Sequence, residues 1–243
     1  MRKRRMGLSG SQQNIAVLVL VVVTAMAAVV GVIYSQSRNQ QAQAAARSAP
    51  TMTIETEPEP YYPRLVVVGD SYSIPNQTSS EWPRKLATER GWRLTNMAVG
   101  GVGYVQQNLD KGKKAFTGNV DAIVALAPDY VIIAGGRNDV SYPRETGPAA
   151  AQMFATLKEQ LPESRIIVIG MIHDNRAPTP TAVEVNATIR REAEAAGLPF
   201  VDALTENWLS DPALLREDGM HPTAEGQAVL RDRINEHLAR LGI

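Results

Sequence analysis

The sequence predicts an α/β fold, a three-layer α/β/α sandwich around a mostly parallel sheet of about five strands. Strand-like apolar runs alternate with helix-like stretches from Arg64 onward. The runs DYVIIAGG from Asp129 and RIIVIGM from Arg165 are rich in β-branched residues and continuous rather than alternating. This pattern is typical of strands buried on both faces of a parallel sheet. Alternating strands and helices then imply right-handed crossovers between parallel strands.

The remaining elements are predicted from the same two patterns. Leu65–Val68 predicts the first strand, and two further strands are predicted for RLTNMAV from Arg93 and LPFVDA from Leu198. Helices are indicated where apolar residues recur at helical spacing. These residues are Ala150, Met153, Phe154, Leu157 and Leu161 in one helix, Val185, Ile189, Ala193 and Ala196 in the next, and Leu230, Ile234, Leu238 and Leu241 in the last.

A single transmembrane helix is expected before this fold. Residues 15–33, IAVLVLVVVTAMAAVVGVI, form an uncharged run of 19 residues. As a helix this run is about 28 Å long, close to the thickness of the hydrocarbon core of a bilayer. The basic residues 2–5 precede it and should stay in the cytoplasm by the positive-inside rule. We therefore expect residues 1–14 to be a basic cytoplasmic N-terminus, 15–34 to be a signal anchor, and the rest to be extracytoplasmic.

A cleaved signal peptide is the alternative to an anchor. Small residues such as Ala25 and Ala27 offer a cleavage site, and cleavage would release a secreted form. The apolar region of a signal peptide usually has roughly 7 to 15 residues, which favours the uncleaved anchor.

After the apolar run, the composition indicates a tether and then one domain. Residues 35–62 are rich in Gln, Ala, Ser, Pro and Glu and predict a disordered tether. Residues 63–243 have the length of one domain with a full hydrophobic core. The formal net charge is zero and no basic stripe interleaves with aromatic residues, so nucleic acid is not expected as a partner. The absence of cysteine excludes disulfides, thiolate catalysis and a lipid anchor on cysteine from these residues.

Three unusual segments are expected at one edge of the sheet. Ser71 follows the first strand, VGGVGY follows the second and GGRNDV follows the third. Ligands of open parallel sheets bind beyond the carboxyl ends of the strands, so these segments are expected to lie together. Ser71 is then a candidate nucleophile, although Gly, Asp and Ser also favour ordinary turns.

A nucleophilic serine needs a base that is itself oriented, and His221 is the candidate. It lies in EDGMHPTAEG, three residues after Asp218, so a turn through Gly219 can bring the carboxylate onto one imidazole nitrogen. An ordinary Asp/Gly turn with a helix cap would explain every residue there except the histidine. His173, in the loop after the fourth strand, could line a cleft or be a solvated loop residue, and His237 in the last helix fits a surface or boundary position.

The segments GDSYS, NMAVGG, GRND and DGMHP resemble the four sequence blocks of the SGNH, or GDSL-type, hydrolases. They occur in the same order, and the resemblance covers the chain from about Arg64 to its end. It implies the flavodoxin-like fold of this family and a catalytic triad of Ser71 as nucleophile, His221 as base and Asp218 as the partner of His221.

The resemblance also implies an oxyanion hole. Gly101 matches the glycine whose backbone N–H binds the oxyanion, Asn138 matches the side-chain donor, and the amide of Ser71 completes the set. Gly100 directly precedes Gly101, so the glycine that matches the family's oxyanion donor is one of these two residues.

These matches predict an extracytoplasmic serine ester hydrolase, either esterase- or lipase-like or a carbohydrate deacetylase. Two alternatives remain, an O-acyltransferase acting on cell-envelope glycans and a non-catalytic tethered domain that binds glycans. The expected partners are a small-molecule, lipid or glycan ester and, through the N-terminal helix, a membrane. No cofactor or metal is implied, since no His/Cys cluster or dinucleotide-binding glycine motif occurs, and the oligomeric state is not predicted.

Overall fold

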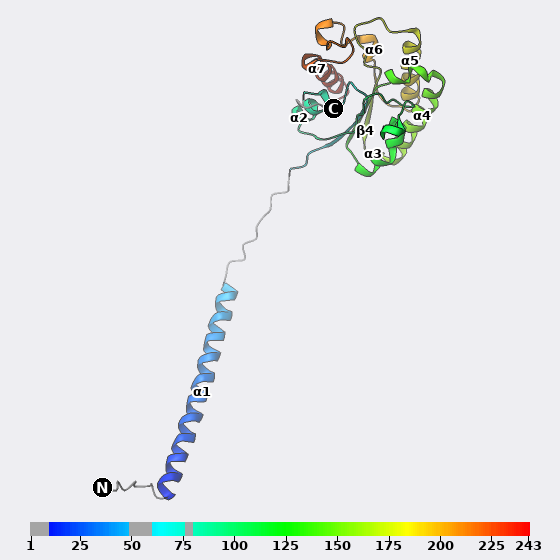
Figure 1. Ribbon diagram of the computed structural model, residues 1–243. Helices are drawn as coiled ribbons and strands as arrows, with labels where there is room; N and C mark the ends of the chain where they lie inside the picture. The colour runs from blue at the N-terminus through cyan, green and yellow to red at the C-terminus, as the bar shows by residue number, and fades with distance from the viewer. Residues whose placement is uncertain (1–9, 49–59, 76–79) are drawn as a thin grey trace, which may run out of the picture. The chain divides into compact units, whose positions relative to one another are not determined.

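A computed structural model of the chain describes residues 10–48, 60–75 and 80–243. The chain divides into two units, with helix α1 (Gly10–Ser48) in the first and residues 60–243 in the second (Figure 1).

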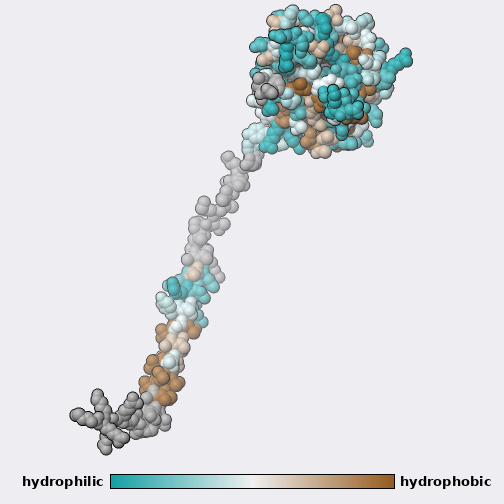
Figure 2. Space-filling model, in the orientation of Figure 1, coloured by the Kyte–Doolittle hydropathy of each residue, from teal (hydrophilic) through white to brown (hydrophobic). Residues whose placement is uncertain are grey.

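Helix α1 contains a candidate membrane span, Val17–Ala44, with a mean hydropathy of 2.8 in its most apolar window. Figure 2 shows the apolar part of this helix in brown and its polar C-terminal part in teal. A helix of this length and composition near the N-terminus fits a membrane anchor or a signal sequence.

The helix continues beyond the apolar run, to Ser48. Residues 35–48, expected to begin a disordered tether, are therefore helical. Their sequence, SQSRNQQAQAAARS, contains four Ala, four Gln and two Arg, which have high helix propensity. Residues 49–59 of the expected tether and residues 1–9 of the expected cytoplasmic segment lie outside the described residues.

The second unit contains one five-stranded sheet in the order β2-β1-β3-β4-β5. All neighbouring strands are parallel, and Val67 of β1, for example, pairs with Asn96 of β2 and Ile132 of β3. The strands are β1 (Arg64–Gly69), β2 (Arg93–Asn96), β3 (Tyr130–Ala134), β4 (Arg165–Ile169) and β5 (Phe200–Val201). The predicted parallel sheet is confirmed.

Helices cover both faces of this sheet (Figure 1). One face packs against α3 (Val120–Leu126), α4 (Pro143–Gln160) and α5 (Pro180–Ala195). The other packs against α2 (Trp82–Glu89) and α7 (Ala224–Arg240). The short helical segments are η1 (Leu109–Lys111), η2 (Phe116–Asn119), η3 (Arg137–Ser141), α6 (Ala203–Glu206) and η4 (Pro212–Leu214). These layers confirm the three-layer α/β/α architecture.

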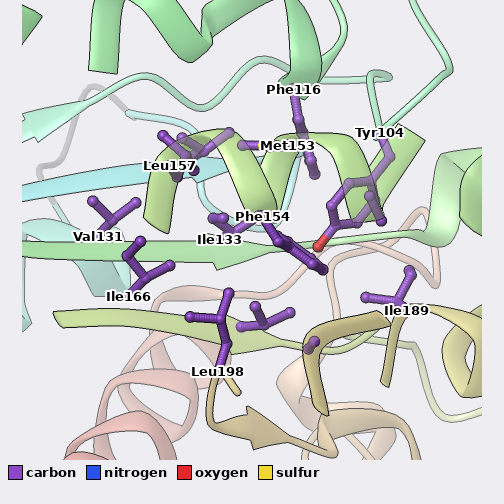
Figure 3. Close-up of a cluster of buried hydrophobic side chains, with 14 of the residues drawn as sticks. Tyr104, Phe116, Val131, Ile133, Met153, Phe154, Leu157, Ile166, Ile189 and Leu198 are labelled. Carbon is purple, nitrogen blue, oxygen red and sulfur yellow. The ribbon is translucent and has the colours of Figure 1, made fainter. Parts of the chain in front are cut away.

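The strands are apolar on both faces, as their continuous apolar runs predicted. Val66 and Val68 of β1 face one apolar cluster, while Leu65 and Val67 face the other. Figure 3 shows the first cluster, in which side chains from α4 such as Phe154 lie against the strands. Burial on both faces fixes the strands firmly, so their carboxyl ends form a rigid edge from which loops can present side chains.

Four strands are shorter than the runs that predicted them. β3 does not include Asp129 or the glycines 135–136, and β4 ends before Gly170. β2 ends at Asn96 rather than Val99, and there the Asn96 side chain accepts the Ala98 N–H at 3.0 Å and donates to the Ser73 carbonyl at 2.8 Å. β5 contains only Phe200–Val201. After Asn96 the chain continues beside β1, since the N–H groups of Met97 and Val99 donate to the carbonyls of Val67 and Gly69 at 2.8 and 2.9 Å, and the glycines that follow therefore lie at the end of β1.

Candidate active site

Ser71 lies in a tight turn directly after β1. The Asp70 carboxylate accepts the Tyr72 N–H at 3.0 Å and the Asp70 carbonyl accepts the Ser73 N–H at 3.1 Å. Asp70, Tyr72 and Ser73 are buried, whereas Ser71 is partly exposed. The turn therefore presents Ser71 at the surface and uses its neighbours to hold the backbone.

His221 is bound to Asp218 through both its side chain and its backbone. One Asp218 oxygen lies 2.8 Å from His221 Nδ1, and the other accepts the backbone N–H groups of Met220 and His221, each at 2.9 Å. Gly219 makes this turn possible with a φ of +63°. The backbone and side-chain hydrogen bonds from His221 lower the pKa of Asp218 below its usual value. An ionised Asp218 favours the tautomer of His221 that carries its proton on Nδ1.

Ser71 and His221 line the same pocket, of about 160 Å³, together with Ile74, Arg216 and Gln227 among others. The chain thus brings together residues that are 150 positions apart in sequence. The Ser71 hydroxyl makes no hydrogen bond to His221 within the described residues. Hydrogen bonds of this kind commonly tighten only when substrate is bound.

Two buried residues that the sequence patterns did not reveal join the two halves of this pocket. The Tyr72 hydroxyl donates to the Met220 carbonyl at 3.0 Å. The Gln227 side chain donates to the Tyr72 carbonyl at 3.1 Å and accepts the Trp82 N–H at 2.8 Å. The only signal for this role in the sequence is a glutamine among the core-facing positions of the last helix. These contacts fix the His221 turn against the Ser71 turn.

The glycines after β2 lie beside Ser71. A Cβ atom added to Gly100 would lie 3.6 Å from the Ser71 Cβ, and Gly101 has a φ of +81° that other residues rarely adopt. Among the described residues, no protein acceptor takes the N–H of Ser71 or of Gly101. Both donors are therefore available to a ligand.

Asn138, in η3 after β3, is partly exposed and donates from Nδ2 to the Val102 carbonyl at 2.8 Å. One N–H of the amide group is thus used within the protein, and the second remains for another acceptor. The Val102 bond places Asn138 next to the segment that carries Gly101.

Asp139 binds the backbone of the segment that follows Gly101. Its buried carboxylate accepts the backbone N–H groups of Tyr104, Val105 and Gln106 at 2.8 to 3.0 Å. A Cβ atom on Gly103 would lie 2.1 Å from this carboxylate, so only glycine fits there. Asp139 therefore acts as a backbone anchor for the loop rather than as a group facing the pocket.

Asp70 is expected to make stability depend on pH. Burial raises its pKa from 3.8 to about 7, against the opposing effect of the Tyr72 N–H. A carboxyl with a raised pKa in the folded state contributes stability that is fully present below the unfolded-state pKa and is lost as the pH rises through about 7. The neutral variant Asp70→Asn should avoid this loss. Between pH 4 and 8 its free energy of unfolding should improve relative to wild type by on the order of 4 kcal/mol.

Denaturant unfolding at a series of pH values measures this difference. A difference that does not change with pH would contradict the raised pKa of Asp70. The measurement does not depend on catalysis, so any effect of the substitution on turnover leaves it intact.

The other two histidines lie outside the pocket lined by Ser71. His173 donates from Nδ1 to the Asp174 carbonyl at 3.1 Å, beside a buried carboxylate that Arg137 and Arg176 bind. His237 contacts Glu206 at 3.0 Å. Neither imidazole lines the pocket that contains Ser71. Within residues 10–48, 60–75 and 80–243, no group of three or more His, Asp or Glu side chains is placed to hold a metal ion.

The chain resembles known proteins in sequence and in structure. Residues 67–229 match the model of the GDSL-like Lipase/Acylhydrolase family. A curated relative, the GDSL lipase Rv0518 of Mycobacterium tuberculosis, is 28% identical over 195 residues, which cover 70% of this chain and 79% of the relative.

Solved structures show the same fold. The esterase EstA of a Pseudoalteromonas species, inhibited by monoethylphosphonate, matches with a TM-score of 0.60 and 14% identity over 73% of this chain and 97% of EstA. The carbohydrate acetylesterase Est24 of Sinorhizobium meliloti matches with a TM-score of 0.57 and 18% identity over 74% of this chain and 99% of Est24. With the family match over more than half of the sequence, these findings show that the chain belongs to the GDSL-like lipase/acylhydrolase family, the SGNH hydrolases that act on carboxylic esters.

Proposed function

We propose that the chain hydrolyses esters through a triad of Ser71, His221 and Asp218. The observation that carries this proposal is the Asp218–His221 pair, with 2.8 Å between carboxylate and Nδ1, in the pocket that Ser71 lines. His221 Nε2 takes the proton of Ser71 as its hydroxyl oxygen attacks the acyl carbonyl. The protonated imidazole then gives that proton to the leaving alcohol, and water releases the acyl group by the same steps.

The oxyanion of each tetrahedral intermediate is bound by the N–H groups of Ser71 and Gly101 and by the amide group of Asn138. The first two have no protein acceptor among the described residues, and Asn138 has one N–H to spare. Donors that are already fixed in place stabilise the developing charge without reorganisation.

A fluorophosphonate probe tests the triad. Full-length protein should be labelled on Ser71, in proportion to its loss of esterase activity, and Ser71→Ala should be neither labelled nor active. An active Ser71→Ala variant would overturn the assignment. The same result would also separate an enzyme from a non-catalytic glycan-binding domain, which needs no reactive serine.

The size of the pocket favours a short acyl group. Its volume of about 160 Å³ is below the roughly 300 to 1,000 Å³ of sites that enclose larger ligands. We therefore infer acetyl-like esters as substrates, and glycan acetyl esters among them, in keeping with the carbohydrate acetylesterase Est24 among the structural relatives. A series of nitrophenyl esters of rising chain length should show the highest kcat/KM for two to four carbons. A maximum at long chains would contradict this inference.

We also propose that α1 anchors the enzyme and that the domain lies outside the membrane. The support is the apolar span within α1 and the basic residues 2–5 before it. External protease should remove the domain from intact cells, while a mature chain that begins after the span and is freely soluble would mean that the segment is a cleaved signal.

A further inference from the structure

Lys113 makes an unexplained contact beside the candidate oxyanion hole. Its ammonium nitrogen donates to the Gly100 carbonyl at 2.8 Å, and the contact is partly buried. Lys113 has no salt-bridge partner within the described residues. A long charged side chain loses rotamer freedom when it is held in one place. The contact of Lys113 with Gly100 therefore has an entropic cost, and we ask what function it serves.

The backbone around Lys113 is built to hold it there. Asn108 and Lys113 exchange both backbone hydrogen bonds, at 2.8 and 2.9 Å, and Gly112 with a φ of +67° closes the turn between them. Three residues later, the chain is anchored by buried Phe116, whose N–H donates to the Gly103 carbonyl at 2.7 Å. Lys113 thus stands on a fixed loop that is tied to the segment after β2.

The Gly100 carbonyl and the Gly101 N–H belong to one peptide group. The described chain contains no cis peptide bond, so this group is planar and its C=O and N–H point in opposite directions. Fixing the carbonyl therefore fixes the direction of the N–H. Flanking glycines without Cβ atoms permit this peptide to rotate more easily than others, which is why an external restraint matters here.

We propose that Lys113 positions the Gly101 N–H for the oxyanion and strengthens it as a donor. The inference rests on the proposed function, in which Gly101 belongs to the oxyanion hole. A hydrogen bond from an ammonium group is charge-assisted and shorter and stronger than a neutral one. It polarises the peptide, so the N–H on the far side becomes a better donor as negative charge develops. Lys113 acts through the peptide and does not touch the substrate.

The test measures kcat per active site, with sites counted by fluorophosphonate titration of full-length protein. Lys113→Met removes the charge and the donor while keeping an unbranched side chain, and should lower kcat by about 10- to 100-fold with KM little changed. Phosphonylation of Ser71 should slow in parallel, because the phosphonyl oxygen needs the same donors. Lys113→Arg, which retains a charged donor, should recover most of the loss.

Lys111→Met is the matched control. Lys111 ends η1 in the same loop and its side chain is exposed, so this variant removes the same charge from the same region and should keep wild-type kcat. A role limited to loop stability would reduce the number of titratable sites and leave kcat per site unchanged.

Three results would overturn the proposal: wild-type kcat in Lys113→Met, an equal loss in Lys111→Met, or a loss that appears only in the count of active sites. If Lys113→Met does not fold, Lys113→Gln takes its place with the same expectation, because the charge is again absent. Failure of the proposed function is a separate outcome, since wild-type Ser71 would then not be phosphonylated at all.

Discussion

Replacing His221 by alanine is expected to lower kcat by about 10⁴- to 10⁶-fold without unfolding the domain. The imidazole is partly exposed, with a side-chain accessibility of 31%, so its loss leaves no large cavity. Without it, none of the described residues that line the pocket is a base suited to take the proton of Ser71, and catalysis is limited to the contribution of the oxyanion donors. Initial rates with a short-chain ester and a thermal melt measure both parts of this expectation.

His237→Ala is the matched control for His221→Ala. His237 pairs with Glu206 and does not line the pocket that contains Ser71, so its removal should leave turnover at the wild-type level. His173→Ala should have a smaller effect than His221→Ala, on KM if on anything. A larger effect of His173→Ala would move the base to the loop after β4.

Asn138→Ala should reduce kcat by about 10²- to 10³-fold, as expected for the loss of one oxyanion donor. The substitution also removes the bond from Nδ2 to the Val102 carbonyl, which should lower the free energy of unfolding by about 1 kcal/mol. The large effect on turnover would report the loss of the oxyanion donor, and the small effect on stability would report the loss of the bond to the Val102 carbonyl. Steady-state kinetics and denaturant unfolding on the same samples measure them.

Asn138→Asp is the sharper companion variant. It keeps the shape of the side chain but places a negative charge beside the developing oxyanion, so it should be at least as inactive as Asn138→Ala. Near-normal turnover in Asn138→Asp would exclude Asn138 from the oxyanion hole. A loss of activity that follows unfolding in both variants would instead identify Asn138 as a residue that only shapes its loop.

The parallel sheet could be predicted because burial on both faces leaves a strong local signal. β3 and β4 are central, and their continuous β-branched runs match the structure closely. β2 and β5 are edge strands with weaker signals, and at the end of β2 the side chain of Asn96 bonds to the backbone of Ser73 and Ala98. Helix α2 could not be predicted because it has only eight residues, of which Trp82, Pro83, Leu86 and Ala87 are buried, too short a pattern for periodicity to detect.

In the candidate site, too, some features could be predicted from the sequence and others could not. Ser71, Asp218 and His221 stand in short motifs whose chemistry is local, and the turn from Asp218 to His221 closes within three residues. The contacts of Tyr72 with Met220 and of Lys113 with Gly100 depend on how separate loops meet in space. Neither periodicity nor spacing in the sequence predicts such contacts between loops, so they could be found only from the structure.

The bond between Tyr72 and Met220 spans 148 residues of sequence, and Gln227 lies in the last helix, α7. The proposed nucleophile, Ser71, therefore lies near the start of the domain, and the proposed base, His221, lies near its end together with Met220 and Gln227, which contact Tyr72. Contacts so distant in sequence require the closure of a long loop, which is entropically costly. Under the proposed function, a chain that stops before Asp218 contains Ser71 but lacks the proposed base, its carboxylate partner and the contacts of Tyr72 and Gln227 that tie the two turns together.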